Sequence, residues 1–522
     1  MQNNDKKVLL RISNLKQYFP LKGGRFVKAN DGISLDIYEG ETFGLVGESG
    51  CGKSTLGRTI LQLYHQTYGR TMYYGRSLDD LAPKYVIDTV KNLKSRRAKL
   101  HELEQKRDKL EAEYAKLSET EQYAKHTELD TARKLAEDAL LDITKIVGGF
   151  LVVDDLDPVI AAYSKDYGIA RKISALEEKR QALQVDVDDA QYAKKTAEEA
   201  GKSEKPGQLE KAQEKLKQCD DQIAALRQQL DAGRQEIEAL RRPYASDPEF
   251  QKYEAYRDDG IDLARLEYNE MRRLRSDMQL IFQDPYSSLN PRMSVGQIIS
   301  EGMQAHNMIK KKDARMQQLV LNIMDECGLA PYFLHRFPHQ FSGGQRQRIG
   351  IARALATNPK FVVCDEAVSA LDVSIQAQII NLLLDLKEHQ NLTYMFITHD
   401  LSVVKYISDR VGVMYLGTMV ELAAADEIFH HPIHPYTEAL LNAIPTTDTV
   451  GAKELSILEG DIPSPVNPPK GCKFHTRCRY CTEICEHAVP AWQEVGPNHF
   501  VACHHMLGCS EETQNDHLSE EV

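Results

Sequence analysis

The 522-residue chain has no run of about 18 apolar residues, so the sequence predicts no membrane-spanning helix. It also lacks an excess of positive charge. The net charge is −12, which argues against a protein that binds nucleic acid without sequence preference, because such binding depends on Lys and Arg neutralising phosphates. The first residues, MQNNDKKVLL, contain no long apolar segment behind a basic region. We therefore expect a soluble protein that is not exported.

Cysteine is scarce except near the end of the chain. Six of the ten cysteines lie between residues 472 and 509, with no export signal before them. Because disulfides are rare in the reducing cytosol, this cluster predicts a metal or iron–sulfur site. Cys478 and Cys481 have the spacing of a chelating pair, and the spacing alone permits either zinc or an iron–sulfur cluster held by four thiolates.

Residues 81–268 differ in composition from the rest of the chain, with about 38% charged residues against about 21% elsewhere. Two segments of this stretch show a seven-residue apolar repeat, which is typical of paired helices. The repeat positions are Leu93, Leu100, Leu103, Leu110, Tyr114 and Leu117 in the first segment, and Leu209, Leu216, Ile223, Leu230 and Ile237 in the second. We expect an antiparallel coiled-coil hairpin inserted into a globular domain, with residues 146–153 as a small tip. A solvated spacer and a docking arm both fit this pattern, and Cys219 on the repeat is expected to fill the core.

Outside this stretch, apolar runs alternate with helical patterns. Residues 43–46, 361–364 and 393–397 read as buried strands, and residues 56–64 and 379–386 as helices. Strands that alternate with helices predict an α/β fold in which helices cover both faces of a parallel sheet.

The sequence GESGCGKST at residues 47–55 directly follows the first predicted strand and opens a helix. Its glycines let backbone N–H groups turn toward phosphate oxygens, and the helix N-terminus adds partial positive charge. Lys53 is expected to reach the β- and γ-phosphates, and Ser54 to ligate Mg²⁺. The pattern predicts a nucleotide-binding site.

Further motifs add the groups that nucleotide hydrolysis needs. Asp365 ends the apolar run FVVCD, where it can hold Mg²⁺ through water, and Glu366 beside it can polarise an attacking water. FSGGQRQR at residues 341–348 has two glycines opening a helix, which predicts a second backbone cradle for phosphate. Gln283 follows a strand-like run, and His399 ends the run TYMFIT.

In this order the motifs resemble those of the nucleotide-binding subunit of ABC transporters. The resemblance implies an ABC-type P-loop fold with a mainly parallel core, an antiparallel β edge and a helical signature subdomain. It also implies a dimer that sandwiches two ATP molecules, with Mg²⁺ held by Ser54, Gln283 and Asp365. Carried over by position, the phosphate loop consists of Gly47, Ser49, Gly50, Gly52, Lys53, Ser54 and Thr55, and the signature consists of Ser342, Gly343, Gly344 and Gln345. The resemblance makes Glu366 the general base, His399 the switch histidine and Gln283 the Q-loop residue. It also places the D-loop at residues 369–372 and gives Tyr18 or Phe19 as the residue that stacks on adenine.

Finer matches, including LKQYFPLKGG, QLIFQDPYSSLNPRMSVGQII and HPYTEALLNAIP, resemble the F-type ATPase subunit of bacterial oligopeptide and dipeptide importers. This resemblance implies a peripheral protein on the cytoplasmic face of the membrane, beneath two membrane-spanning permease subunits. It also implies a partner ATPase of the D type, an extracellular substrate-binding protein, and no nucleic acid partner. The region from Gln283 to Val295 would receive the permease subunits.

The terminal cysteines also match this family. Its pattern maps to Cys472, Cys478, Cys485 and Cys503, and this quartet resembles a [4Fe–4S] site, with zinc as the alternative. Cys481 and Cys509 are additional thiols that could replace one of the four ligands.

The expected domains are 1–80 and 269–430 for the two parts of the ATPase, 81–268 for the arm, 431–509 for the cysteine-containing region, and 510–522 for a disordered acidic tail. A chromosome- or repair-type ATPase of the SMC kind is the alternative function, since it also joins such a head to a coiled coil. SMC heads, however, place the coil between the Q-loop and the signature, whereas here it precedes Gln283.

Overall fold

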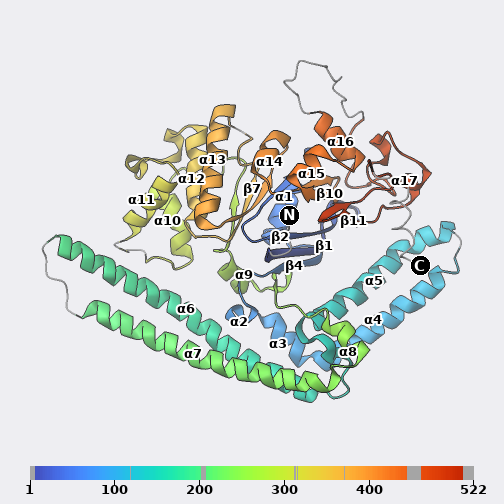
Figure 1. The fold of residues 1–522 in the computed structure, drawn as a ribbon, viewed down its shortest axis with the longest axis horizontal. Helices are drawn as coiled ribbons and strands as arrows, with labels where there is room; N and C mark the ends of the chain where they lie inside the picture. The colour runs from blue at the N-terminus through green and yellow to red at the C-terminus, as the bar shows by residue number, and fades with distance from the viewer. Residues whose placement is uncertain are drawn as a thin grey trace. The chain divides into compact units, whose positions relative to one another are not determined.

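The computed structural model describes residues 6–117, 119–200, 207–310, 313, 315–369, 371–443 and 460–508. The chain divides into two compact units (Figure 1): unit 1 contains Met1–Gly75 and Arg272–Val522, and unit 2 contains Arg76–Met271. Within the described ranges, every helix is too short or too polar to cross a bilayer. Cys509 and the acidic segment 510–522 lie outside the described residues.

Among the described residues, unit 1 is built on an eight-stranded sheet in the order β11-β12-β10-β9-β3-β8-β7-β6. Its parallel strands are β3 (Thr42–Val46), β6 (Met278–Ile281), β7 (Phe361–Asp365), β8 (Thr393–Ile397) and β9 (Arg410–Tyr415). The antiparallel edge consists of β10 (Thr418–Ala424), β11 (Gln493–Gly496) and β12 (His499–Val501). All residues of β3, β7 and β8 are buried, as apolar strands covered on both faces must be. The three predicted strands and the mainly parallel core are confirmed.

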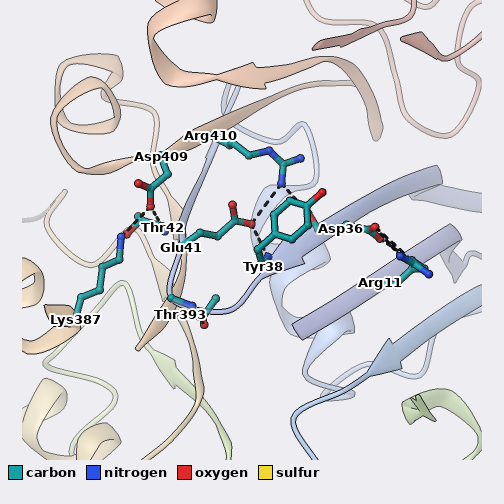
Figure 2. Close-up of polar contacts among 10 residues, drawn as sticks. Arg11, Asp36, Tyr38, Glu41, Thr42, Lys387, Thr393, Asp409 and Arg410 are labelled. Atoms are coloured by element: carbon teal, nitrogen blue, oxygen red, sulfur yellow. Dashed lines mark hydrogen bonds and ion pairs between the residues drawn. The ribbon is translucent and has the colours of Figure 1, made fainter. Parts of the chain in front are cut away.

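A second, antiparallel sheet in unit 1 places β1 (Val8–Pro20) between β2 (Phe26–Tyr38) and β4 (Tyr68–Tyr73). The turn from β2 to β3 is held by a buried ion pair between Glu41 and Arg410, with 3.4 Å between Oε1 and Nη1 (Figure 2). The guanidinium of Arg410 also lies 4.9 Å from the centre of the Tyr38 ring. These contacts fix the amino-terminal end of β3, at the opposite end of this strand from the phosphate loop.

Helices cover the sheets of unit 1, and α10 to α13 pack on one another around a shared apolar core. The helix α1 directly follows the glycine-rich loop and ends at Ile60, four residues earlier than predicted. The remaining bounds are α1 (Lys53–Ile60), α10 (Val295–Ala305), α11 (Met316–Glu326), η4 (Pro331–Phe333), η5 (Pro338–Gln340), α12 (Gly343–Leu355), α13 (Val373–Gln390), α14 (Leu401–Ile407), α15 (Ala425–His430), α16 (Pro435–Asn442), η6 (His475–Arg477) and α17 (Glu483–His487).

Unit 2 is almost entirely helical. Its elements, with α9 ending just beyond it, are α2 (Leu78–Leu81), α3 (Lys84–Lys91), α4 (Leu93–Tyr114), α5 (Glu119–Val147), η1 (Gly148–Val152), α6 (Asp157–Glu199), α7 (Gln208–Arg241), η2 (Arg242–Tyr244), α8 (Pro248–Glu254), β5 (Ile261–Asp262), η3 (Leu263–Arg265) and α9 (Tyr268–Leu274).

The expected single hairpin, in which the two heptad segments pair, is wrong. The structure pairs α4 with α5 and α6 with α7 (Figure 1), so each heptad segment packs on a helix with a less regular sequence. Cys219 is 3% exposed and packs with Ile173 of α6, as predicted for a core residue. Residues 146–153 are not a tip, because Phe150 lies in an apolar cluster with Phe250, where their rings meet edge to face.

Candidate functional site

The loop between β3 and α1 has the backbone geometry of a phosphate cradle. Gly47, Gly50 and Gly52 have positive φ angles of 145°, 81° and 104°. A Cβ on Gly47 would lie 2.2 Å from the Met414 carbonyl oxygen, and one on Gly52 would lie 2.2 Å from that of Ala29. Glycine is therefore required at both positions, and the two glycines allow the tight turn into a helix N-terminus that phosphate loops have.

Lys53 begins α1 and folds back over this loop. Its side chain is buried, and Nζ donates hydrogen bonds to the carbonyl oxygens of Gly47 at 2.7 Å and Glu48 at 3.1 Å. The ammonium group is thus held within the loop whose N–H groups would surround a phosphate. A cation at this place complements the charge of a nucleotide's phosphates.

Ser54 and Asp365 come together from α1 and the end of β7. The Ser54 hydroxyl donates to Asp365 Oδ1 at 2.6 Å, and Arg58 donates from Nη2 to Oδ2 at 3.1 Å. Asp365 is 1% exposed, so its charge depends on these partners. A hydroxyl and a carboxylate oxygen in contact are ligands that fit Mg²⁺. Arg58 was not singled out from the sequence, because a basic residue on a helix carries no motif.

Glu366 contacts two other predicted site residues, Gln283 and His399. Its carboxylate accepts a hydrogen bond from Gln283 Nε2 at 2.5 Å and lies 3.5 Å from Nδ1 of His399. Glu366 has a φ of +48°, and its backbone N–H donates to Ile397 at 2.9 Å. The predicted Gln, Glu and His therefore share one site at the carboxyl ends of parallel strands.

The predicted signature residues begin α12. Ser342 and Gln345 form a reciprocal capping box, in which the Ser342 hydroxyl accepts from the Gln345 N–H at 3.4 Å. Gly344 is buried against Ile375, where a Cβ would lie 2.4 Å from Cγ2. Within the described ranges, no hydrogen bond joins Ser342, Gly343, Gly344 or Gln345 to the phosphate loop of the same chain. These residues form a separate cradle from the one around Lys53.

The two candidate adenine-stacking residues face different neighbours. The Tyr18 hydroxyl donates to Asp31 Oδ1 at 2.5 Å, and burial together with this carboxylate raises the pKa of Tyr18. Phe19 instead meets Tyr64 edge to face, with 5.3 Å between ring centres. Phe19 therefore lies toward the segment that follows α1, whereas Tyr18 is held by the hydrogen bond from its hydroxyl to Asp31.

The C-terminal region contacts the phosphate loop through side chains that the sequence did not reveal. Arg477 donates two hydrogen bonds to the Glu48 carboxylate, at 2.8 and 3.1 Å. The Glu48 N–H donates to the Tyr436 hydroxyl at 3.0 Å. Because more than 380 residues separate Glu48 from each of these partners, no local pattern predicts the contacts.

The four predicted cysteine ligands are neighbours. Burial, with a further contribution from the thiols of Cys472, Cys478 and Cys485, raises the pKa of Cys503 to about 12. The Cys503 sulfur also accepts a hydrogen bond from the His505 N–H at 3.3 Å, a kind of contact that tunes metal-bound thiolates. However, in the part of the chain that the structure describes, no group of three or more Cys, His, Asp or Glu side chains is arranged to hold a metal ion. The cluster and zinc predictions are therefore not confirmed.

Comparison with known families gives two matches. The ABC transporter family matches residues 30–251 and 251–369, and the family of the oligopeptide/dipeptide transporter C-terminal region matches residues 420–485. Together they span both segments of unit 1.

Two curated relatives come from Bacillus subtilis. The oligopeptide transport ATP-binding protein AppF is 52% identical over 250 residues, which cover 47% of this chain and 75% of AppF. The putative oligopeptide transport ATP-binding protein YkfD is 34% identical over 498 residues, which cover 95% of each chain. Among solved structures, CbiO1 from Clostridium perfringens aligns with 82% of this chain and 92% of its own at 16% identity and a TM-score of 0.41.

The matches cover the strand, loop and helix that carry Lys53, the Asp365–Glu366 pair, and the region in which Tyr436 and Arg477 contact the loop. The two Bacillus subtilis relatives are 52% and 34% identical to this chain over 75% and 95% of their own length. The chain is an ABC ATPase and belongs to the family of ATP-binding proteins of oligopeptide and dipeptide importers.

Proposed function

We propose that this chain hydrolyses ATP to power the import of oligopeptides or dipeptides through separate membrane-spanning subunits. The observation that carries the proposal is the convergence of Gln283, Glu366 and His399 beside the Ser54–Asp365 contact. The names of the relatives, which are peptide import and oligopeptide transport proteins, supply the cargo class. They give no support to the SMC-type alternative.

We assign the roles as follows. The phosphate loop and Lys53 bind and orient the phosphates, and Glu366 accepts a proton from the attacking water. His399 contacts the γ-phosphate, where it stabilises the charge that develops as the bond breaks. Mg²⁺, when bound to Ser54, Asp365 and Gln283, would supply positive charge to the β- and γ-phosphate oxygens. Phe19 is proposed to stack on adenine, because its ring lies toward the segment after α1.

The signature residues are proposed to act on the nucleotide of a second subunit. Ser342, Gly343, Gly344 and Gln345 make no hydrogen bond to the loop of their own chain in the described residues, and they begin α12, where a helix N-terminus attracts an anion. A dimer would bring this cradle to the γ-phosphate bound by the partner. The proposed partner is a D-type ABC ATPase.

A groove in unit 1 supports contact with permease subunits on the cytoplasmic face of the membrane. It has a volume of about 630 Å³ and is lined by residues of α10 and α11, including Gln297 and Met316, and by Met293 just before α10. Its lining begins at Met293, within the Q-loop region, and combines apolar thioethers with amide groups, which suits an amphipathic helix. An extracellular binding protein would deliver the peptide, and unit 2 would serve as a spacer or docking arm.

The function is tested with the Glu366→Gln variant, tagged and purified in mild detergent from its native membranes. We expect ATP binding to be retained and phosphate release to fall at least 100-fold, because the amide accepts no proton. We also expect two multi-span proteins and a second ABC ATPase to copurify. Glu388→Gln, an exposed change on α13, is the control with normal turnover. Undiminished hydrolysis by Glu366→Gln would refute the base, and soluble partners alone would refute the importer.

We also propose that Cys472, Cys478, Cys485 and Cys503 hold a [4Fe–4S] cluster. Their mutual proximity and the N–H donors at the sulfurs support this assignment. Anaerobically purified protein should contain about four irons per chain. One zinc per chain, without iron, would instead identify a tetrahedral thiolate site.

A further inference from the structure

Unit 2 encloses a cavity of about 390 Å³ that the ATPase function does not use. It lies among α2, α3, α6 and α7, and much of its wall is apolar, including Ala82, Val86, Ala170, Leu230 and Ile237. This volume is in the range of sites for small organic molecules.

The charged groups of the wall are not balanced. Each of the three lining cations has an acidic partner: Arg234 pairs with Asp79, Lys145 with Asp258 at 2.8 Å, and Arg257 with Glu238 at 3.8 Å. Asp166, which also lines the cavity, has no ion-pair partner within the described ranges. Asp259 also lines the cavity, so five acidic residues face three cations and the net charge is negative. Of these acids, Asp166 is the buried one without an ion-pair partner among the described residues.

Asp166 is 8% exposed, and its Oδ1 is buried without a hydrogen-bond partner among the residues that the structure describes. This oxygen lies against Gly233 of α7, where an added Cβ would be only 1.8 Å away. Gly233 is also the residue that interrupts the apolar seam of α7. At this position α7 has no side chain to pack against α6, and the space that a Cβ would need is occupied by the Asp166 carboxylate. A buried carboxylate without a partner is unfavourable, and pairing with a cation offsets that cost. Because Oδ1 is covered by Gly233, a cation in the cavity would pair with Asp166 through Oδ2.

We propose that this cavity binds a small organic cation, whose primary ammonium group pairs with Asp166 and whose aliphatic body lies against Val86, Leu230 and Ile237. A divalent metal ion fits poorly, because Ca²⁺ and Mg²⁺ require about six oxygen ligands and no group of three or more acidic, His or Cys side chains among the described residues is arranged to hold a metal ion. A diamine and the amino end of a short peptide both carry the required ammonium group. The proposal does not depend on ATP hydrolysis or transport.

The test is isothermal titration calorimetry of the full-length chain at pH 7.5 with two probes, 1,4-diaminobutane and alanyl-alanine. Binding of one molecule per chain by either probe supports the site, and the tighter probe identifies the source of the ammonium group. 1-Butanol, which lacks the charge, should not bind. Failure of both cationic probes, or equal binding of 1-butanol, would overturn the proposal.

Asp166→Asn should weaken binding at least tenfold, because it removes the charge with little change in shape. The matched control is Glu236→Gln. Glu236 pairs with Lys165 at 2.7 Å, next to Asp166 in sequence, but does not line the cavity, so affinity should stay within twofold. Ala170→Leu should also abolish binding by filling the cavity, with circular dichroism to verify folding. Unchanged affinity in Asp166→Asn would disprove the assignment.

The pH dependence gives an independent readout. Burial raises the pKa of Asp166 to about 6, with Arg234 and Lys165 opposing the shift and Asp79 and Glu236 adding to it. Because the neutral acid does not pair with ammonium, affinity should fall as the pH drops below about 6 and be constant above about 7. Affinity that is independent of pH between 5 and 7 would contradict a role for Asp166.

Discussion

Glu366 is a residue whose backbone conformation is as informative as its side chain. A φ of +48° is unfavourable for a residue with a Cβ, and such conformations are retained where the surroundings fix them. Here the Glu366 N–H is bound to Ile397, and Ala367 behind it is 2% exposed. The turn directs the carboxylate toward Gln283 and His399.

The ion pair with Arg477 is expected to reduce the electrostatic repulsion between the Glu48 carboxylate and the phosphates of bound ATP. In Arg477→Met the Glu48 carboxylate would face the bound phosphates without its partner, so the dissociation constant for ATP should rise about five- to tenfold, or about 1 to 1.4 kcal/mol. The double variant Glu48→Gln with Arg477→Met should restore affinity to within twofold of the native protein. Equilibrium titration with a fluorescent ATP analogue measures both.

Arg479→Met is the matched control for this prediction. Arg479 is two residues away and pairs with Glu438 at 2.6 Å, and its exposed side chain makes no contact with the loop among the described residues. ATP affinity should be unchanged in this variant. Equal weakening by Arg477→Met and Arg479→Met would show that general disturbance of the C-terminal region, and not the Glu48 charge, is responsible.

At the scale of elements, the sequence predicts those strands and loops whose structure depends on a local pattern of residues. The strands β3, β7 and β8 could be predicted because they are apolar over their whole length and buried on both faces. The loop before α1 could be predicted because its glycines are required by positive φ angles. Gln283, Glu366 and His399 were predicted individually, and their contact follows from the parallel order of the strands that they end.

Helix pairing in unit 2 could not be predicted in the same way. A heptad repeat shows that a helix packs along one stripe but does not identify the partner. The partner of α7 is α6, whose buried positions, such as Ile173 and Val185, follow a less regular pattern. Gly233 occupies one position of the α7 stripe where a side chain would meet the Asp166 carboxylate, and Asp166 lies 67 residues earlier in the chain. Contacts between distant segments are the part of the fold that local patterns leave open.

At the scale of the whole molecule, unit 1 is assembled from two segments that the sequence of unit 2 separates. The two ends beside this interruption are held together within unit 1. The Tyr73 hydroxyl donates to Asp277 at 3.0 Å, and Lys360 donates from its side chain to the Gly75 carbonyl oxygen. The backbone N–H groups of Lys360 and Phe361 also donate to the Asp277 carbonyl oxygen, at 2.8 and 2.9 Å. Both ends are therefore anchored at the start of β7.

Because of this anchoring, unit 1 should fold without unit 2. Residues 76–271 would be replaced by about six glycine and serine residues, which span roughly 14 Å as a flexible chain. We expect the shortened protein to be monomeric or dimeric in gel filtration and to bind ATP within about twofold of the full chain, since β3, α1 and β7 all lie in unit 1. Lys53→Ala in the shortened protein should abolish binding and shows that the signal comes from the phosphate loop. Aggregation of the shortened protein, or loss of ATP binding with its helix content intact, would mean that unit 2 takes part in forming the nucleotide site.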